Sequence, residues 1–234
     1  RGLGDVYKRQ VLGVDITVER LLPVAVAAAQ ELAHRAPADL QSRTVVIGYD
    51  RRFLAPELAE AITAAVRGCE LEPLLTETAV PTPACSWAVV ERQALGALVI
   101  TASHNPPEWL GLKIKGPFGG SVEGDFTAAV ERRLAAGGIT APIQGSVARF
   151  DGRGDHLDGL RRKLNIPGLI SGLRAMNLKV IVDPMHGSAA GCVKDLLGPE
   201  GHQLVEEIRS ERDPLFGGNP CLLYTSPSPR DNGR

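Results

Sequence analysis

Ser103, His104 and Lys113 are the residues of this chain whose types and spacing could support chemistry. Ser103 and His104 follow the apolar run Leu95–Ala102, and the sequence NPP comes directly after them. A hydroxyl, an imidazole and an ammonium group can act as nucleophile, proton carrier and charge stabiliser. The two prolines prevent a helix from starting there and stiffen the loop, and a fixed geometry contributes to rate. The stretch therefore predicts a catalytic Ser103.

Residue types alone leave several interpretations of this loop open. Ser103 could be the nucleophile of a hydrolase or transferase, although the Gly-x-Ser-x-Gly elbow of many such enzymes is absent. The loop could also be a polar turn, because Ser and Asn are common before Pro for conformational reasons. Whether His104 or Lys113 moves the proton is open as well.

The elements that must position these residues alternate between strand and helix. Two strands, Thr44–Asp50 and Leu95–Ala102, are almost continuously apolar, which is typical of strands covered on both faces. The alternation predicts an α/β fold around a largely parallel sheet, whose ligands bind beyond the carboxyl ends of the strands, where Ser103 lies. The other expected strands are Glu72–Thr76 and Gly111–Lys115, and the expected helices are Thr17–Arg35, with Thr17 as its cap, Pro56–Arg67, Pro83–Gln93 and Phe126–Ala136.

A weakly patterned stretch from Gly138 to Gly154 predicts a domain boundary. We therefore expect one domain over residues 11–150, and a linker with the truncated start of a second α/β domain over residues 151–220. The elements expected in this second part are the helix Asp155–Leu164, the strand Leu178–Met185, the helix Ala189–Leu197 and the strand Gln203–Ile208.

The two ends of the chain have an unusual relation at the level of DNA. One DNA sequence encodes RGLGDVYKRQ on one strand and CLLYTSPSPR on the complementary strand, and it resembles the transposon adapter of sequencing libraries. We therefore interpret residues 1–10 and 221–234 as translated adapter sequence and exclude them from reasoning about the fold. On this interpretation, Val11 to Pro220 is an interior fragment of a longer protein.

Composition excludes several classes of protein. Subtracting the five basic and two acidic residues of the ends from the formal net charge of −1 gives −4 for Val11 to Pro220, which argues against nonspecific nucleic-acid binding. No apolar run is long enough to predict a membrane span. The cysteines Cys69, Cys85 and Cys192 form no CxxC pair, so neither a zinc site nor a disulfide framework is indicated, and a reducing cytoplasm is the expected location.

The loop also resembles the active-site loop of a known family, the α-D-phosphohexomutases, which include phosphoglucomutase and phosphomannomutase. The resemblance extends over nearly all of Val11 to Pro220, with the family's motifs in the same order and at similar spacing. These motifs are GYDRR (Gly48–Arg52), VPTPA (Val80–Ala84), ITASHNP (Ile100–Pro106), GLKIKGPFGG (Gly111–Gly120), VDPMHG (Val182–Gly187) and ERDPLFGGNP (Glu211–Pro220). One departure is Trp109-Leu110-Gly111, where the family usually has an aromatic residue, Asn and Gly.

The resemblance implies a fold and an activity. The fold would be the three-layer α/β/α domain I of a phosphohexomutase, followed by the truncated start of a similar domain. The activity would be interconversion of hexose 1-phosphate and hexose 6-phosphate, through a phosphoserine and a hexose 1,6-bisphosphate. The resemblance does not say whether the sugar is glucose, mannose or glucosamine.

The resemblance also assigns roles to residues. Ser103 would be the phosphoserine, His104 and Lys113 would transfer protons or contact phosphate, and Arg52, Thr101 and Asn105 would bind substrate or phosphate. One Mg²⁺ would be bound through a phosphoryl oxygen on Ser103, with its other ligands in an Asp-rich loop that this sequence does not contain. We therefore expect the chain by itself to be inactive as a mutase. A non-catalytic module that binds sugar phosphates is a further alternative.

Overall fold

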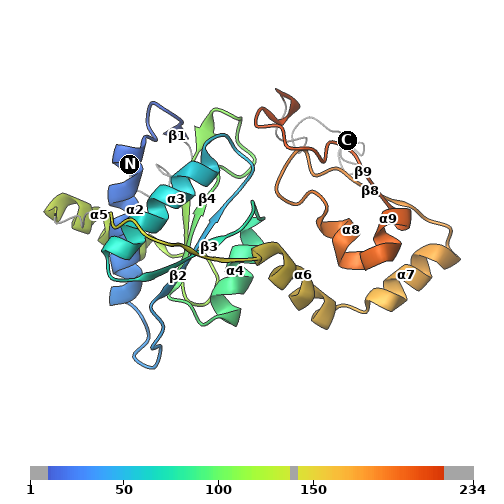
Figure 1. Ribbon diagram of the computed structural model, residues 1–234, viewed down its shortest axis with the longest axis horizontal. Helices are drawn as coiled ribbons and strands as arrows, with labels where there is room; N and C mark the ends of the chain where they lie inside the picture. The colour runs from blue at the N-terminus through green and yellow to red at the C-terminus, as the bar shows by residue number, and fades with distance from the viewer. Residues whose placement is uncertain (1–9, 138–141, 219–234) are drawn as a thin grey trace, which may run out of the picture.

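A computed structural model describes residues 10–137 and 142–218 (Figure 1). The segments interpreted as adapter sequence therefore lie outside the described residues, apart from Gln10. Gln10 and Val11 form β1 (Gln10–Val11), which pairs antiparallel with β5 (Trp109–Leu110).

A five-stranded mixed sheet is the centre of the first part of the chain. Four of its strands are parallel, and only the edge strand β6 runs antiparallel to its neighbour β4. The expected parallel-dominated sheet is thus confirmed. In spatial order the strands are β6 (Leu112–Lys115), β4 (Gly96–Ile100), β2 (Thr44–Tyr49), β3 (Glu72–Thr76) and β7 (Ala148–Phe150).

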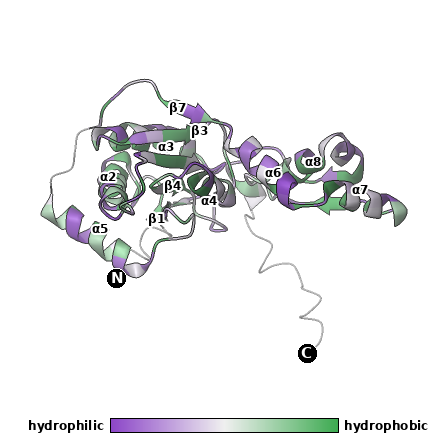
Figure 2. Ribbon diagram, turned by 90° about the horizontal axis from the view of Figure 1, so that it is seen from below, coloured by the Kyte–Doolittle hydropathy of each residue, from purple (hydrophilic) through white to green (hydrophobic). Residues whose placement is uncertain are grey.

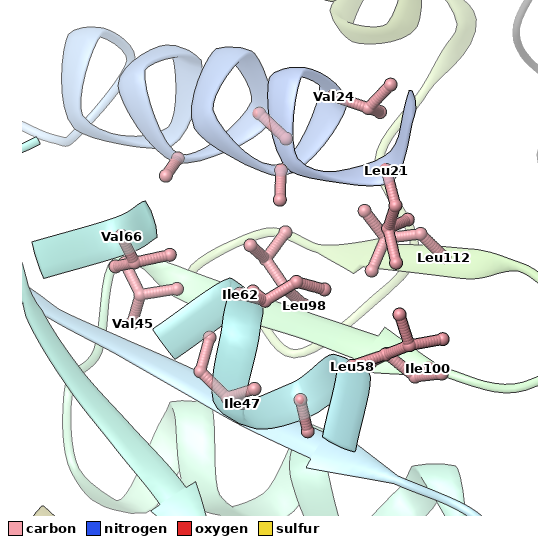
Figure 3. Packing of buried hydrophobic residues seen from close by; sticks show 14 of the residues in the cluster. Leu21, Val24, Val45, Ile47, Leu58, Ile62, Val66, Leu98, Ile100 and Leu112 are labelled. Atoms are coloured by element: carbon pink, nitrogen blue, oxygen red, sulfur yellow. The ribbon is translucent and has the colours of Figure 1, made fainter. Parts of the chain in front are cut away.

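Helices cover both faces of this sheet, which confirms the three-layer α/β/α architecture. Successive side chains of a strand point to opposite faces, so Val45 and Ile47 join one apolar cluster and Val46 joins the other. Figure 3 shows the larger cluster, in which side chains of two helices interdigitate with those of the strands. The helices on that face are α2 (Val18–His34), α3 (Ala55–Gly68) and α5 (Gly124–Ala136), and α4 (Thr82–Glu91) covers the other face.

A buried carboxylate joins two of these helices. Glu31 of α2 accepts hydrogen bonds from Arg35 at 2.6 Å and from Arg133 of α5 at 2.7 Å. Burial raises the pKa of Glu31, but the hydrogen bonds and charges of Arg133 and Arg35 outweigh it, and the pKa lies below its ordinary value. The ion pairs therefore hold α5 against α2 while the carboxylate is ionised.

The second part of the chain lies beside α4 and is predominantly helical (Figure 2). Its helix α6 packs on α4, where Gly159 faces the Trp87 indole so closely that a Cβ atom would lie 2.2 Å from the ring. The elements are α6 (Gly152–Lys163), α7 (Ile166–Ala175), β8 (Val180–Val182), α8 (Cys192–Leu197), α9 (Gly201–Leu204) and β9 (Val205–Glu207), with short 3-10 turns at Gly198–Glu200 and Phe216–Gly218. Strands β8 and β9 are parallel.

Some expected elements differ from those in the structure. The Thr17 side chain makes no capping hydrogen bond to α2, whereas the side chains of Asp151 and Asn165 do cap α6 and α7. The expected strand Gln203–Ile208 is shorter, because its first two residues belong to α9. Helix α7 was not expected, since two glycines interrupt its pattern and it contains no buried residue.

Among the residues that the structure describes, no helix has both the length and the apolar character needed to cross a bilayer.

Candidate active site

The candidate site lies where two neighbouring parallel strands end. The segment after β2 contains Asp50 and Arg52, and the segment after β4 contains Ser103. The chain leaves β2 toward β3 on one side and leaves β4 toward β6 on the other, so the connections diverge between β2 and β4. Such a divergence opens a crevice at the carboxyl edge of an open sheet, which is the usual ligand site of this architecture.

The Ser103 backbone adopts a left-handed conformation, with φ of 59°, which is uncommon for a residue with a side chain. Two local hydrogen bonds hold this geometry. The Ser103 N–H donates to Thr101 Oγ1 at 3.0 Å, and the Asn105 side-chain amide donates to the Ala102 carbonyl at 2.6 Å. The Ser103 side chain remains exposed. The loop thus presents the hydroxyl to solvent on a backbone that its neighbours hold in place.

Arg52 supports the loop from inside the protein. It is 1% exposed, and its guanidinium donates to four backbone carbonyls of the loop. The Nε atom faces the Asp50 carboxylate at 3.4 Å. The four acceptors are Ser103 at 3.1 Å, Asn105 at 2.7 Å, Pro106 at 2.8 Å and Trp109 at 3.0 Å.

The contact with substrate or phosphate that the resemblance implied for Arg52 stays a prediction. In the structure the Nη donors of Arg52 point at loop carbonyls, and the guanidinium is shielded from solvent. Thr101 is also buried, and its hydroxyl accepts from the Ser103 backbone. The structure therefore places Arg52 behind the loop, whereas Thr101 holds the Ser103 backbone and also borders the cleft.

A cleft of about 530 Å³ lies on the solvent side of the loop. Its wall includes Ser103, His104 and Lys113, so the structure brings together the three residues that the sequence singled out for chemistry. His104 Nδ1 lies 3.5 Å from Ser103 Oγ, and Lys113 on β6 pairs with Val99 on β4. Thr101 and Asn105 line the same cleft.

The cleft contains further groups that the sequence did not single out. Lys115 follows Lys113 by two residues along β6 and also lines the cleft, with its Nζ donating to Ser121 Oγ at 3.1 Å. Period-two alternation along the expected strand Gly111–Lys115 could have linked the two lysines. The start of α5 at Gly124 borders the same space. Two ammonium groups and a helix N-terminus favour an anionic ligand, and Glu123 is the acidic residue of the same lining that opposes it.

Asp50 is a second feature that sequence analysis did not single out. Burial raises the pKa of this carboxyl above its ordinary value, although the hydrogen bond from Thr101 and the charge of Arg52 oppose the rise. The carboxylate also accepts from the Arg52 backbone N–H at 3.1 Å. Asp50 thus orients the arginine that holds the loop.

The described residues do not fit a complete metal site. Among them, no group of three or more His, Cys, Asp or Glu side chains is placed to hold a metal ion.

Comparisons with known proteins agree with this architecture. A family model described as phosphoglucomutase/phosphomannomutase, alpha/beta/alpha domain I, matches residues 8–138. A phosphoglucosamine mutase of Cereibacter sphaeroides is 32% identical over 194 residues, which are 81% of this chain and 41% of that protein. A phosphoglucomutase of Staphylococcus epidermidis is 28% identical over 193 residues, which are 78% of this chain and 34% of that protein.

A solved structure shows the same fold. The crystal structure of a candidate phosphomannomutase from Thermus thermophilus superposes with a TM-score of 0.79 at 32% identity. The match covers 96% of this chain and 48% of that chain. This chain thus spans less than half the length of each of these relatives.

Proposed function

Since this chain belongs to the phosphoglucomutase/phosphomannomutase family, we propose that it forms the phosphoryl-carrying part of a phosphohexomutase, with Ser103 as the carrier. The observation that supports this most directly is the presentation of Ser103. Its hydroxyl is exposed at the carboxyl edge of the sheet on a left-handed backbone, beside His104 and Lys113 in one cleft. In the whole protein we propose that the substrates are hexose 1-phosphate and hexose 6-phosphate.

The proposed reaction consists of two phosphoryl transfers. The bond between Ser103 Oγ and phosphorus breaks, the phosphoryl group passes to the free hydroxyl of a hexose monophosphate, which loses its proton to a base, and Ser103 Oγ takes up a proton. The resulting hexose 1,6-bisphosphate reorients and returns its other phosphoryl group to Ser103, whose hydroxyl loses its proton while that sugar oxygen gains one. Such transfers depend on positioning and on stabilising charge at the phosphoryl oxygens.

The roles of the neighbouring residues follow from their positions. Either His104 or Lys113 is the proposed proton carrier, and the lysines of β6 that stay protonated offset phosphate charge. Asn105 fixes the loop through the Ala102 carbonyl and borders the cleft in which we propose that the substrate binds. Arg52 supports the loop from behind, and Thr101 holds the Ser103 backbone at the wall of the cleft. A divalent ion such as Mg²⁺ would stabilise charge on the transferred group when bound, with a Ser103 phosphoryl oxygen as the ligand from this chain.

The proposal also covers the organisation and location of the chain. We place a domain boundary near residue 150, between β7 and α6. We expect the chain by itself to lack mutase turnover, because the described residues supply too few metal ligands. None of the three cysteines in the described ranges forms a disulfide, which is compatible with the reducing cytoplasm that we propose as its location.

The test is phosphate on Ser103. The gene should be extended to full length, and the protein incubated with glucose 1,6-bisphosphate and magnesium and analysed by peptide mass spectrometry. We expect phosphate on the peptide that contains Ser103, and no phosphate and no isomerisation in Ser103→Ala. Isomerisation that survives Ser103→Ala would contradict the proposal. Labelling of Ser103 by a fluorophosphonate, without phosphate transfer, would favour the hydrolase alternative.

A further inference from the structure

The segment that includes residues 210–218 in the second part of the chain contacts the support of the Ser103 loop. Arg51 Nη1 donates to the Ser210 carbonyl at 2.7 Å, and Arg212 Nη2 donates to the Arg52 carbonyl at 3.3 Å. The Phe216 ring lies over the Arg52 guanidinium, with the Arg52 Cζ atom 4.9 Å from the ring centroid. Three separate contacts therefore join residues that are far apart in the sequence.

The contact with Phe216 completes the surroundings of Arg52. The Nη donors lie in the guanidinium plane and point at the loop carbonyls, and Nε faces Asp50, so the face of the group is left for a ring. Phe216 covers it and is itself only 6% exposed. A cation over an aromatic face is attracted by the ring quadrupole, and more strongly when water is excluded.

The position of Phe216 is set by a turn. Asp213 accepts from the backbone N–H of Leu215 at 2.9 Å and of Gly217 at 2.8 Å, and these hydrogen bonds lower the pKa of its carboxyl. Phe216 has a φ of 53°, a left-handed conformation that a side chain rarely adopts. The turn therefore holds an unusual backbone geometry at the residue that covers Arg52.

We propose that Phe216 is a positioning residue for the Ser103 loop, acting through Arg52, so that docking of the second part of the chain sets the geometry of the phosphoryl carrier. This inference rests on the proposed function for its catalytic meaning, but the contact itself does not. Where Phe216 covers Arg52, water is kept from the hydrogen bonds to the Ser103, Asn105, Pro106 and Trp109 carbonyls. Where it moves away, water competes for them and the loop opens more often.

Hydrogen exchange followed by mass spectrometry on the 234-residue chain tests the proposal without any substrate. In Phe216→Leu, we expect the backbone amides of residues 101–105 and 108–110 to exchange about thirtyfold faster, which is the size of a desolvated cation–π contact. Peptides from α2 and α3 should be unchanged, which shows that the first part is still folded. Phe216→Tyr keeps a ring over Arg52 and should restore the slow exchange.

Two further variants make the experiment specific. Phe53→Leu is the matched control. Phe53 is next to Arg52 in the sequence, but its side chain is 57% exposed, so the change removes a ring that does not cover the guanidinium. It should leave exchange of the loop at the wild-type rate. Should Phe216→Leu misfold, Asp213→Ala loosens the turn and leaves the Phe216 side chain intact, and it should also accelerate exchange of the loop.

The outcomes separate this inference from the proposed function. Unchanged loop exchange in Phe216→Leu, or equal acceleration in Phe216→Leu and Phe216→Tyr, would overturn the positioning role. Absence of phosphate on Ser103 in the full-length protein would instead overturn the phosphoryl-carrier proposal, and the exchange result would still stand.

Discussion

Replacing Arg52 by methionine should destabilise the protein strongly, because the arginine is the internal support of the Ser103 loop. The change removes four hydrogen bonds from a charged group to backbone carbonyls and leaves the Asp50 carboxylate without its cation. Four such bonds at about 1.5 kcal/mol each would total about 6 kcal/mol. The methionine avoids the desolvation of the arginine, so we expect a net loss of about 3–5 kcal/mol in the free energy of unfolding.

Urea unfolding followed by circular dichroism measures this loss, and Arg52→Lys is the informative companion. Lysine keeps the charge but has one ammonium group with three donors, which cannot reach four carbonyls in the planar fork of a guanidinium. We therefore expect Arg52→Lys to lose most of the same stability. Unfolding free energies of Arg52→Met within about 1 kcal/mol of wild type, or an Arg52→Lys variant as stable as wild type, would refute the reasoning.

The pH dependence of the unfolding free energy of Arg52→Met identifies the part of the loss that comes from Asp50. Burial raises the pKa of this carboxyl above 3.8, with Thr101 and Arg52 opposing the rise, so loss of Arg52 should raise it further. A carboxyl whose pKa is raised by folding lowers stability as the pH rises through its folded pKa. The loss of unfolding free energy in Arg52→Met, relative to wild type, should therefore be smaller near about pH 4 than near about pH 7. Adding Asp50→Asn should reduce the defect at neutral pH, because no buried carboxylate is then left without a partner.

Three other predictions concern the framework. Glu31→Gln should lower the free energy of unfolding by about 1–2 kcal/mol at neutral pH. Because its arginine partners lower the pKa of Glu31 below 4.5, the difference in urea midpoint between wild type and Glu31→Gln should disappear as the pH falls through the folded-state pKa. Gly159→Ala should lower the free energy of unfolding by about 1–3 kcal/mol, because it forces a Cβ atom against Trp87. Gly172→Ala, in α7 with open space around it, should be neutral or stabilising in the same unfolding assay. The Cys85 thiol is buried with its pKa raised to about 12, so iodoacetamide should modify it only after unfolding, as mass spectrometry would show.

The order of strands and helices in the first part of the chain could be read from the sequence. The apolar runs that became β2 and β4, the prolines near the starts of α3 and α4, and the alternation of elements are local patterns with local physical causes. The same patterns placed Ser103 just after a strand, at the edge where ligands bind. Short or weakly patterned elements such as β7 and α7 could not be read, because three residues or a helix interrupted by glycines give too little periodic signal.

What only the tertiary structure decided is which groups meet. The sequence by itself determined that Ser103, His104 and Lys113 are the residues suited to chemistry, and the pairing of β4 with β6 then placed them in one cleft. Nothing local to Arg52 indicates that its side chain turns inward to the loop carbonyls and lies under Phe216. The burial and the partners of a charged side chain depend on segments that are distant in the sequence and that folding brings together. Hydrophobic periodicity and residue propensities are local, so they cannot predict such contacts.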